Sequence, residues 1–308
     1  MSKIHVIHEN DAWVEPLRAA FAERGLPYQE WFLSEGVFDF ASEPPPGVFY
    51  NRMSASSHTR GHRYAPELTA AVLAWLRSHD RRVINNARAL QLELSKLDQY
   101  ATLARYGIRT PHTVAAVGRD NIVEAARAFD GPFITKHNQG GKGLGIRLFS
   151  SSEQLEDYVN SEEFDAGPRG QVLLQQYIKP REPFITRVEI LGGRFLYALR
   201  SDTSEGFELC PADACQLPAA APDVCPADGA AKFSLSPLEA DDPLVARYIR
   251  LCDGEGFDLA GIEFVESEDG ERYTYDINGT TNYNSAVGAQ AGVDGMRELA
   301  RYLTQLKP

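Results

Sequence analysis

The sequence lacks both a long apolar run and a surplus of basic residues. No stretch approaches the length of a membrane span, and the N-terminus M-S-K-I-H-V-I-H has no hydrophobic signal segment. Lys and Arg number 31 against 43 Asp and Glu, which gives a net charge of −12. Because nucleic-acid-binding domains are usually basic, this balance argues against a nucleic-acid partner. We expect a cytoplasmic protein with no membrane or nucleic-acid partner, in which any positive charge for an anionic ligand is local.

The four cysteines do not have the spacing of a metal site. Cys210, Cys215 and Cys225 fall in or beside the Pro- and Ala-rich stretch 211–231, and Cys252 falls in an expected helix. None forms a C-x-x-C pair or a standard zinc pattern. We expect free thiols, with a redox-dependent bridge between Cys210 and Cys215 as the alternative.

The two common glycine-rich nucleotide motifs are missing as well. Neither a strand-to-helix G-x-G-x-x-G with a downstream acid nor a loop ending in G-K-[ST] is present. Instead, 133–149 reads F-I-T-K-H-N-Q-G-G-K-G-L-G-I-R-L-F, which is two β-leaning runs joined by a glycine-rich loop. Glycines let backbone N–H groups approach anionic oxygens, and lysines beside them supply charge. The pattern predicts a flap over a polyphosphate, with a plain hairpin loop as the alternative; the residues concerned are Lys136, Gln139, Gly140, Gly141, Lys142, Gly143 and Gly145.

The 308 residues, 43% of them hydrophobic, are enough for two or three domains. Residues 1–90 alternate between strand and helix patterns, which predicts an open parallel α/β domain. Such sheets bind ligands beyond the carboxyl ends of their strands, so Asn51, Arg52 and Asn85 are substrate candidates, with turn or capping roles as the alternative.

Two further units are expected. Residues 91–170 form a central helical region, with one helix over Ala87–Tyr106, and a small α+β unit that carries the flap and a helix capped by Ser152. Residues 171–308 form a third unit of alternating strands that begins at Val172 and ends with a hairpin of Gly261–Glu266 and Arg272–Asn278.

The last hairpin carries three oxygen-bearing side chains. Asp276 and Asn278 are two apart on one strand and therefore project to one face, where the partner strand brings Glu263 beside them. Clustered carboxylates with an amide oxygen suit Mg²⁺, with Mn²⁺ as an alternative ion. A solvated, exposed strand face is the other interpretation of the same pattern.

Two features lie between the flap and this hairpin. Gln175, Gln176, Tyr177 and Ile178 form an edge that suits a purine base, or else a buried strand with two surface glutamines. Arg187 lies in mid-strand, where a charge is costly unless it is paired. A phosphate, an acyl phosphate or Glu189 would each pair it.

From about Asn85 to Ala291, these motifs in this order resemble the ATP-grasp superfamily. The resemblance is to the RimK-like ligases in particular, with glutathione synthetase and D-alanine ligase as more distant relatives. It implies an ATP-grasp fold, in which an N-terminal α/β domain precedes two α+β subdomains that clamp ATP. It also implies that Arg187 and Lys136 are catalytic, that Glu263, Asp276 and Asn278 hold Mg²⁺, and that the ATP contacts include Lys96, Lys136, the flap residues, Gln175, Gln176, Tyr177 and Ile178.

The sequence departs from that family near the ribose and the acceptor substrate. The family's ribose-binding acid falls on Ile185, so the contact is expected from Glu182 or is lost. The family run E-x-N-x-S-P-G is replaced by D-I-N-G-T-T-N-Y-N, and F-E-L-C-P-A-D-A-C follows the G-G-R hairpin. The substrates are therefore not carried over, although the loop 54–62, Asp213 and Asn282 are candidates for selecting them.

The resemblance implies an ATP-dependent carboxylate–amine ligase. Such an enzyme forms an amide or peptide bond through an acyl phosphate and releases ADP and phosphate. Its partners would be small-molecule or peptide carboxylates and amines, with a homodimer as the commonest assembly. Two alternatives stay open at this point: a nucleotide-binding, non-catalytic regulatory module, and a carboxylase-type ATP-grasp enzyme. A protein kinase is disfavoured because no H-R-D or D-F-G segment is present.

Overall fold

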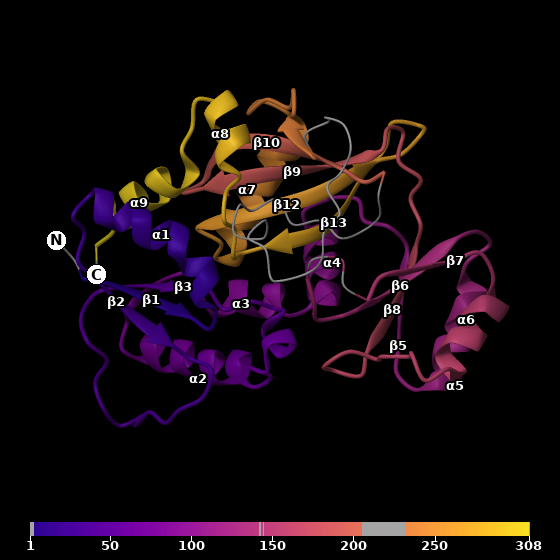
Figure 1. Cartoon of the computed structure of the whole chain (residues 1–308), viewed down its shortest axis with the longest axis horizontal. Coiled ribbons are helices and arrows are strands. Elements are labelled where there is room, and N and C mark those ends of the chain that lie inside the picture. Colours follow the sequence, from indigo (N-terminus) through magenta and orange to yellow (C-terminus); the bar gives the residue numbers. More distant parts are fainter. Residues whose placement is uncertain (1–2, 142, 144, 205–231, 308) are drawn as a thin grey trace, which may run out of the picture.

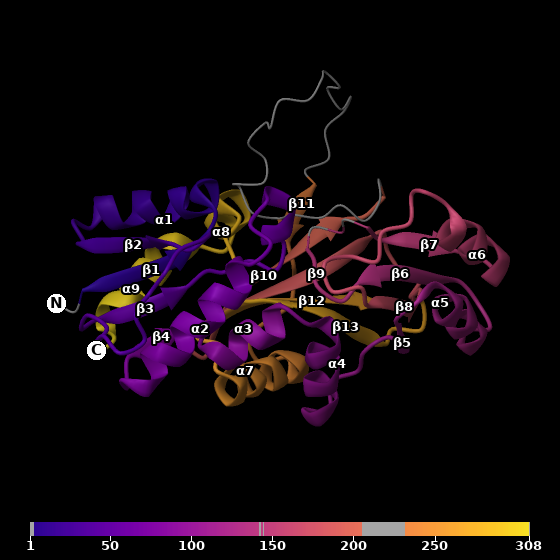
Figure 2. The same cartoon turned by 90° about the horizontal axis from the view of Figure 1, so that it is seen from below.

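The computed structural model describes residues 3–141, 143, 145–204 and 232–307. Lys142, Asp213, Cys210, Cys215 and Cys225 lie outside the described residues. Figures 1 and 2 show an elongated molecule with the N-terminal sheet at one end and a small α+β unit at the other. A further β-sheet, the third in chain order, lies between them.

The N-terminal sheet is parallel, as the sequence predicts. Its strand order is β2-β1-β3-β4, and every residue of β1 is buried. The helices α1 and α2 are amphipathic and turn their apolar residues into two buried clusters. The elements are β1 (Ile4–His8), α1 (Asp11–Glu23), β2 (Tyr28–Phe32), β3 (Val48–Asn51), η1 (Ser57–Arg60), α2 (Ala65–Ser78) and β4 (Arg82–Ile84).

The single helix predicted over Ala87–Tyr106 is wrong. The structure has two helices, α3 (Ala87–Glu93) and α4 (Lys96–Arg105). Ser95 between them has an extended backbone, and its hydroxyl accepts a hydrogen bond from the N–H of Asp98. This N-cap starts a new helix, and it places Lys96 at the first residue of α4.

The second sheet is antiparallel in the order β5-β8-β6-β7, and α5 and α6 pack on one face of it. The sequence assigns Val172–Gln176 to the third unit, but this strand, β8, pairs with β6 here, Leu173 opposite Lys136. The helix cap is Ser151 rather than Ser152, since the Ser151 hydroxyl accepts from the N–H of Gln154. The elements are β5 (Thr113–Ala116), α5 (Arg119–Ala125), η2 (Ala126–Ala128), β6 (Phe133–His137), β7 (Arg147–Phe149), α6 (Ser152–Asn160) and β8 (Val172–Gln176).

The third sheet is antiparallel in the order β11-β10-β9-β12-β13, with α7 packed against it. The predicted last hairpin is confirmed, and Glu263 lies opposite Asp276. The elements are β9 (Phe184–Leu191), β10 (Arg194–Asp202), β11 (Phe233–Leu235), α7 (Pro243–Glu255), β12 (Leu259–Glu266) and β13 (Arg272–Asn278).

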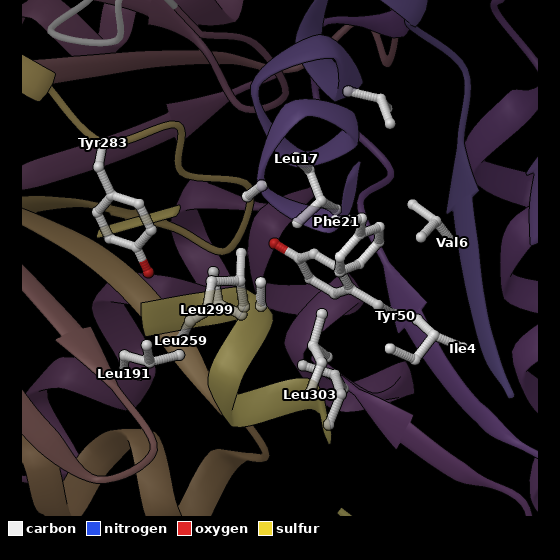
Figure 3. Close-up of a cluster of buried hydrophobic side chains, with 14 of the residues drawn as sticks. Ile4, Val6, Leu17, Phe21, Tyr50, Leu191, Leu259, Tyr283, Leu299 and Leu303 are labelled. Carbon is white, nitrogen blue, oxygen red and sulfur yellow. The ribbon is translucent and has the colours of Figure 1, made fainter. Parts of the chain in front are cut away.

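The two helices that follow, α8 (Ser285–Gln290) and α9 (Gly295–Gln305), have no counterpart in the sequence analysis. Helix α9 lies beside α1 (Figure 1), and Leu299 and Leu303 share a buried cluster with Leu17 and Phe21 (Figure 3). Helices from the two ends of the chain therefore pack into one hydrophobic core. The domain boundaries expected from the sequence stay a prediction.

Within the described residues, no helix has the length and apolar character needed to cross a bilayer.

Candidate active site

A cavity of about 240 Å³ lies where the predicted flap, the second sheet and the last hairpin meet. Residues from the N-terminal domain and from the segment after β13 complete its wall. The structure thus brings together groups that lie far apart in the sequence. The sequence-predicted residues in the wall are Ser54, Ala55 and Ser56 of the loop 54–62, Lys96, Lys136, Gly140, Gly141, Gly143, Gln175, Gln176, Tyr177, Ile178, Arg187, Glu263, Asp276, Asn278 and Asn282.

The three candidate metal ligands come from neighbouring strands. Glu263 on β12 lies opposite Asp276 on β13, and Asn278 follows on the same face of β13, with its Nδ2 3.4 Å from Asp276 Oδ2. The Lys96 ammonium donates to Asp276 Oδ1 at 2.5 Å. Burial pushes the pKa of Asp276 upward, but the charge and hydrogen bond of Lys96, together with the charges of Lys136 and Arg187, hold that pKa below its usual value. Two carboxylates and an amide oxygen on one wall fit Mg²⁺.

Arg187 joins this group from β9. Its Nη1 donates to Glu263 Oε1 at 2.8 Å, and its Nε donates to Glu189 Oε1 at 2.7 Å. The side chain is buried, and it lies over Gly261, where a Cβ atom would overlap the guanidinium. Burial alone would lower the pKa of Arg187, but the charges of Glu189 and Glu263 raise it above its usual value. The guanidinium is therefore fixed, charged and adjacent to a candidate metal ligand.

Lys136 on β6 has a different environment. Its side chain is buried, and its Nζ lies 5.2 Å from the ring centroid of Tyr100 and 5.8 Å from that of Tyr275. No carboxylate of the described residues is within ion-pair distance of it. Burial, helped by the nearby charge of Lys96, lowers the pKa of Lys136 to about 7. A buried lysine without a partner anion is suited to bind an anionic ligand.

The predicted purine edge begins at the end of β8. Main-chain N–H groups of Gln176 and Tyr177 donate to the carbonyls of His112 and Pro132, so the segment is held at both sides. Gln175 is buried and donates to Thr113 Oγ1 at 2.7 Å. The apolar side chains that complete this part of the wall are Ile134, Ile146, Ile185 and Val265.

Three predicted ATP contacts are not in the cavity wall. Gln139 is buried and donates to the Ala55 carbonyl at 3.2 Å, while Arg169 donates to its Oε1 at 2.7 Å. Gly145 lies beside the ring of His137 instead. Glu182 is exposed and lines a second cavity, whereas Ile185 lines the first, so the structure does not support the ribose contact expected from Glu182.

Asn51 and Asn85 also lie outside the wall, and their amides are already used. Asn51 donates to the Asn85 carbonyl, and Asn85 donates to the carbonyls of Leu259 and Gly279 and accepts from the N–H groups of Asp258 and Leu259. The carboxyl edge of the parallel sheet is thus docked onto β12. We therefore reinterpret these two asparagines as structural residues, because no polar atom is left for a substrate.

Arg52 reaches the cavity only indirectly. It is buried and donates to Tyr50 Oη at 3.0 Å, to the Trp13 carbonyl at 3.0 Å and to Asn282 Oδ1 at 2.5 Å. Asn282 itself lines the cavity. Arg52 is therefore placed to orient Asn282.

Sequence analysis missed several residues of the wall, among them Trp13 and Glu93. Glu93 ends α3, and its Oε2 accepts the N–H of Gly279 at 2.6 Å. Burial raises the pKa of Glu93 to about 7. No local pattern marks these residues, because they reach the cavity only when the N-terminal domain docks onto the third sheet.

No protein-family model matches the chain. Beta-citrylglutamate synthase B from Danio rerio is 22% identical over 240 residues, which cover 77% of this chain and 54% of that protein. A probable alpha-L-glutamate ligase from Teredinibacter turnerae is 30% identical over 125 residues, or 40% of each chain. The alpha-aminoadipate–LysW ligase LysX from Sulfolobus acidocaldarius is 22% identical over 280 residues, or 91% of each. The chain thus spans about half, or less, of the length of the first two relatives.

Two solved structures share the whole architecture. The ATP-grasp ligase PsnB in complex with a minimal precursor has a TM-score of 0.68 at 16% identity, with 99% of both chains covered. A RimK domain ATP-grasp protein from Sphaerobacter thermophilus has a TM-score of 0.67 at 19% identity, covering 98% of this chain and 99% of that one. The chain therefore has the ATP-grasp fold. Within that class, the resemblance to RimK-like ligases that the sequence suggests is confirmed by these relatives.

Proposed function

We propose that this protein is an ATP-dependent, ADP-forming carboxylate–amine ligase. One observation carries the proposal: Lys96, Lys136 and Arg187 meet Glu263 and Asp276 in the wall of one cavity that also has a glycine flap. Cations beside clustered carboxylates suit a nucleotide triphosphate with its Mg²⁺. Structures of the similar ligase PsnB are described as complexes with Mg and ADP, which supports the same cofactors here.

The reaction would proceed in two steps. A substrate carboxylate oxygen attacks the γ-phosphorus of ATP, the bond between the γ-phosphorus and the bridging oxygen breaks, and ADP leaves. The neutral nitrogen of an amine then attacks the carbonyl carbon of the acyl phosphate, the C–O bond to phosphate breaks, and the nitrogen loses a proton to water, which gives the amide and inorganic phosphate. The chemistry requires positioning and charge neutralisation more than a covalent enzyme group.

The residues of this chain have distinct roles in that scheme. Lys96 and Lys136 bind phosphate oxygens, and Arg187 binds the phosphoryl group in transfer, because its guanidinium is fixed by Glu189 and Glu263. Glu263, Asp276 and Asn278 would hold Mg²⁺, which neutralises the phosphate charge when it is bound. The flap glycines Gly140, Gly141 and Gly143 cover the site and keep water from the acyl phosphate.

The substrates belong to the proposal as well. The names of the relatives point to glutamate, so L-glutamate is the first compound to test, both as amine and as carboxylate. A peptide substrate is the next class, because PsnB structures are described with a precursor peptide. The homodimer and the cytoplasmic location stay predictions.

A two-stage assay tests the function. Small carboxylates are first screened with MgATP and hydroxylamine, which traps an acyl phosphate as a hydroxamate; amines are then screened with the active carboxylate, and the product is identified by mass spectrometry. The proposal predicts a hydroxamate and equimolar ADP. ATP binding without ADP release for any carboxylate would instead indicate a regulatory module, and ADP release that requires bicarbonate would indicate a carboxylase-type enzyme.

A further inference from the structure

The described wall of the cavity contains three carboxylates, and two of them already have a cationic partner. Asp276 pairs with Lys96 at 2.5 Å, and Glu263 pairs with Arg187 at 2.8 Å. Glu93 is the third. Among the described residues, no Lys, Arg or His nitrogen lies within 4.0 Å of its carboxylate.

The contacts of Glu93 are with neutral groups. Its Oε2 accepts the Gly279 N–H at 2.6 Å, and its Oε1 is 3.4 Å from Thr280 Oγ1. These contacts fix the carboxylate in the wall without neutralising it. Glu93 is half-buried. A carboxylate that is partly removed from water and lacks a cation is unfavourable unless a ligand supplies one, and burial raises its pKa to about 7.

Glu93 lies on the side of the cavity that the N-terminal domain and the segment after β13 form, near enough to Asp276 and Lys96 for their charges to act on it. Its neighbours in the wall are Ala55 from the N-terminal domain and Thr280 after β13, and Trp13 and Asn282 belong to the same wall. The purine edge and the flap are contributed by the second sheet instead. In the sequence, the segment after β13 is also where the chain departs from the pattern of the ligases it resembles, and Glu93 contacts that segment at Gly279 and Thr280.

We propose that Glu93 binds the acceptor amine, as an ammonium group, and holds it beside the acyl phosphate, where the ammonium releases one proton to water before its nitrogen attacks. This inference rests on the proposed ligase function. It defines the amine substrate as one that enters as a cation, which favours α-amino acids and alkylamines over amides and anilines. Glu93 supplies the counter-charge that the chain itself does not.

A purely structural role, in which Glu93 only anchors Gly279, can be distinguished from amine binding, because the first needs the hydrogen bond to Gly279 and the second needs the negative charge. In Glu93→Gln the side-chain amide oxygen still accepts the Gly279 N–H, while the negative charge is gone. Asp98→Asn is the matched control, because Asp98 is an acid at the start of α4 that bonds Gln91 and is absent from the cavity wall.

The experiment compares wild type, Glu93→Gln and Asp98→Asn in two assays. The first measures hydroxamate formation from the screened carboxylate, since hydroxylamine is largely uncharged at neutral pH. The second measures amide formation with the active amine, with L-glutamate as the first probe. We expect Glu93→Gln to raise the KM for the amine by about 10-fold to 100-fold, while its hydroxamate rate and its KM for ATP stay near the wild-type values. In Asp98→Asn, all three quantities should stay near the wild-type values.

Two results would overturn the inference. An unchanged KM for the amine in Glu93→Gln would show that the carboxylate does not bind it. A parallel loss of hydroxamate formation would show that Glu93 supports the fold or the phosphate site instead. Absence of hydroxamate in the wild type is a separate outcome, which refutes the ligase function itself.

Discussion

Arg187 on β9 and Glu263 on β12 lie opposite each other in the antiparallel register, and their side chains form an ion pair of 2.8 Å. Glu263 in turn lies opposite Asp276 on β13. One row across three strands therefore joins the candidate phosphoryl contact to two candidate metal ligands. This row exists because side chains directly opposite in a sheet project to one face.

Gly261→Ala tests whether Arg187 must hold this position. A Cβ atom at Gly261 would overlap the Arg187 guanidinium, so the arginine has to move away from Glu263 and Glu189. We expect kcat to fall by about 10-fold to 1,000-fold with little change in KM for ATP, measured by ADP release. Gly131→Ala is the control, since nothing lies within 4 Å of its added Cβ. Full activity in Gly261→Ala would separate Arg187 from catalysis.

Asp276→Asn tests the metal assignment. The substitution keeps the shape of the side chain but removes the charge that pairs with Lys96 and would bind Mg²⁺. Turnover should fall by about 100-fold or more, and isothermal titration should show that Mg²⁺ no longer strengthens ADP binding. The circular dichroism spectrum should stay that of the wild type. Normal turnover in this variant would contradict the metal site.

The lowered pKa of Lys136 predicts that nucleotide binding depends on pH. Its pKa is lowered to about 7 from an ordinary value of 10.5, so above pH 7 the ligand-free protein has lost this charge. Bound phosphates favour the charged form, and nucleotide binding at pH 8 should therefore take up protons and weaken as pH rises. Calorimetry in two buffers of different ionisation enthalpy measures the uptake. The uptake should be reduced in Lys136→Met, and equal uptake in both proteins would contradict the assignment.

The same group affects the stability of the ligand-free protein, with a defined sign. Between pH 7 and 10.5 the unfolded lysine keeps its proton and the folded one does not. The unfolded state thus binds more protons, so the contribution of Lys136 to the free energy of unfolding rises with pH in that window. Urea denaturation of wild type and Lys136→Met at pH 7 and pH 9 isolates this contribution as the difference between the two proteins. A contribution of Lys136 to the free energy of unfolding that falls with pH would refute the lowered pKa.

Asn85→Ala should reduce stability rather than substrate binding. Asn85 makes four hydrogen bonds to the main chain of the third sheet and the segment after β13, and its backbone φ of 51° suits asparagine better than alanine. We expect a loss of about 3 kcal/mol in the free energy of unfolding. Asn121→Ala, which removes one exposed bond to Val117, is the control. A KM effect without loss of stability would restore Asn85 as a substrate residue.

The sequence predicted the parts of the fold that depend on local pattern. The alternation of strand and helix patterns predicted the parallel N-terminal sheet. The two-residue period of a strand predicted that Asp276 and Asn278 share one face. The helix break at Ser95 was missed because Ala87–Tyr106 is apolar enough to be read as one helix. Strand β8 was misplaced because its pairing partner, β6, lies about 40 residues earlier in the chain.

Long-range docking explains the remaining errors in the site. The sequence shows that Asn51 and Asn85 lie at the carboxyl ends of parallel strands, but not that β12 covers that edge. Glu93 is an unremarkable helix residue in sequence and becomes a cavity residue through its contact with Gly279, 186 residues later. Such contacts depend on how the domains pack, and the periodicity of apolar residues in the sequence does not reveal this.

The most direct test of the whole account is ATP-dependent hydroxamate formation across a panel of small carboxylates, measured together with ADP. The account predicts at least one carboxylate that gives hydroxamate and ADP in equal amounts, only with Mg²⁺, and at a strongly reduced rate in Asp276→Asn. ADP release without hydroxamate, or no ADP release with any carboxylate, would contradict a carboxylate-activating cavity.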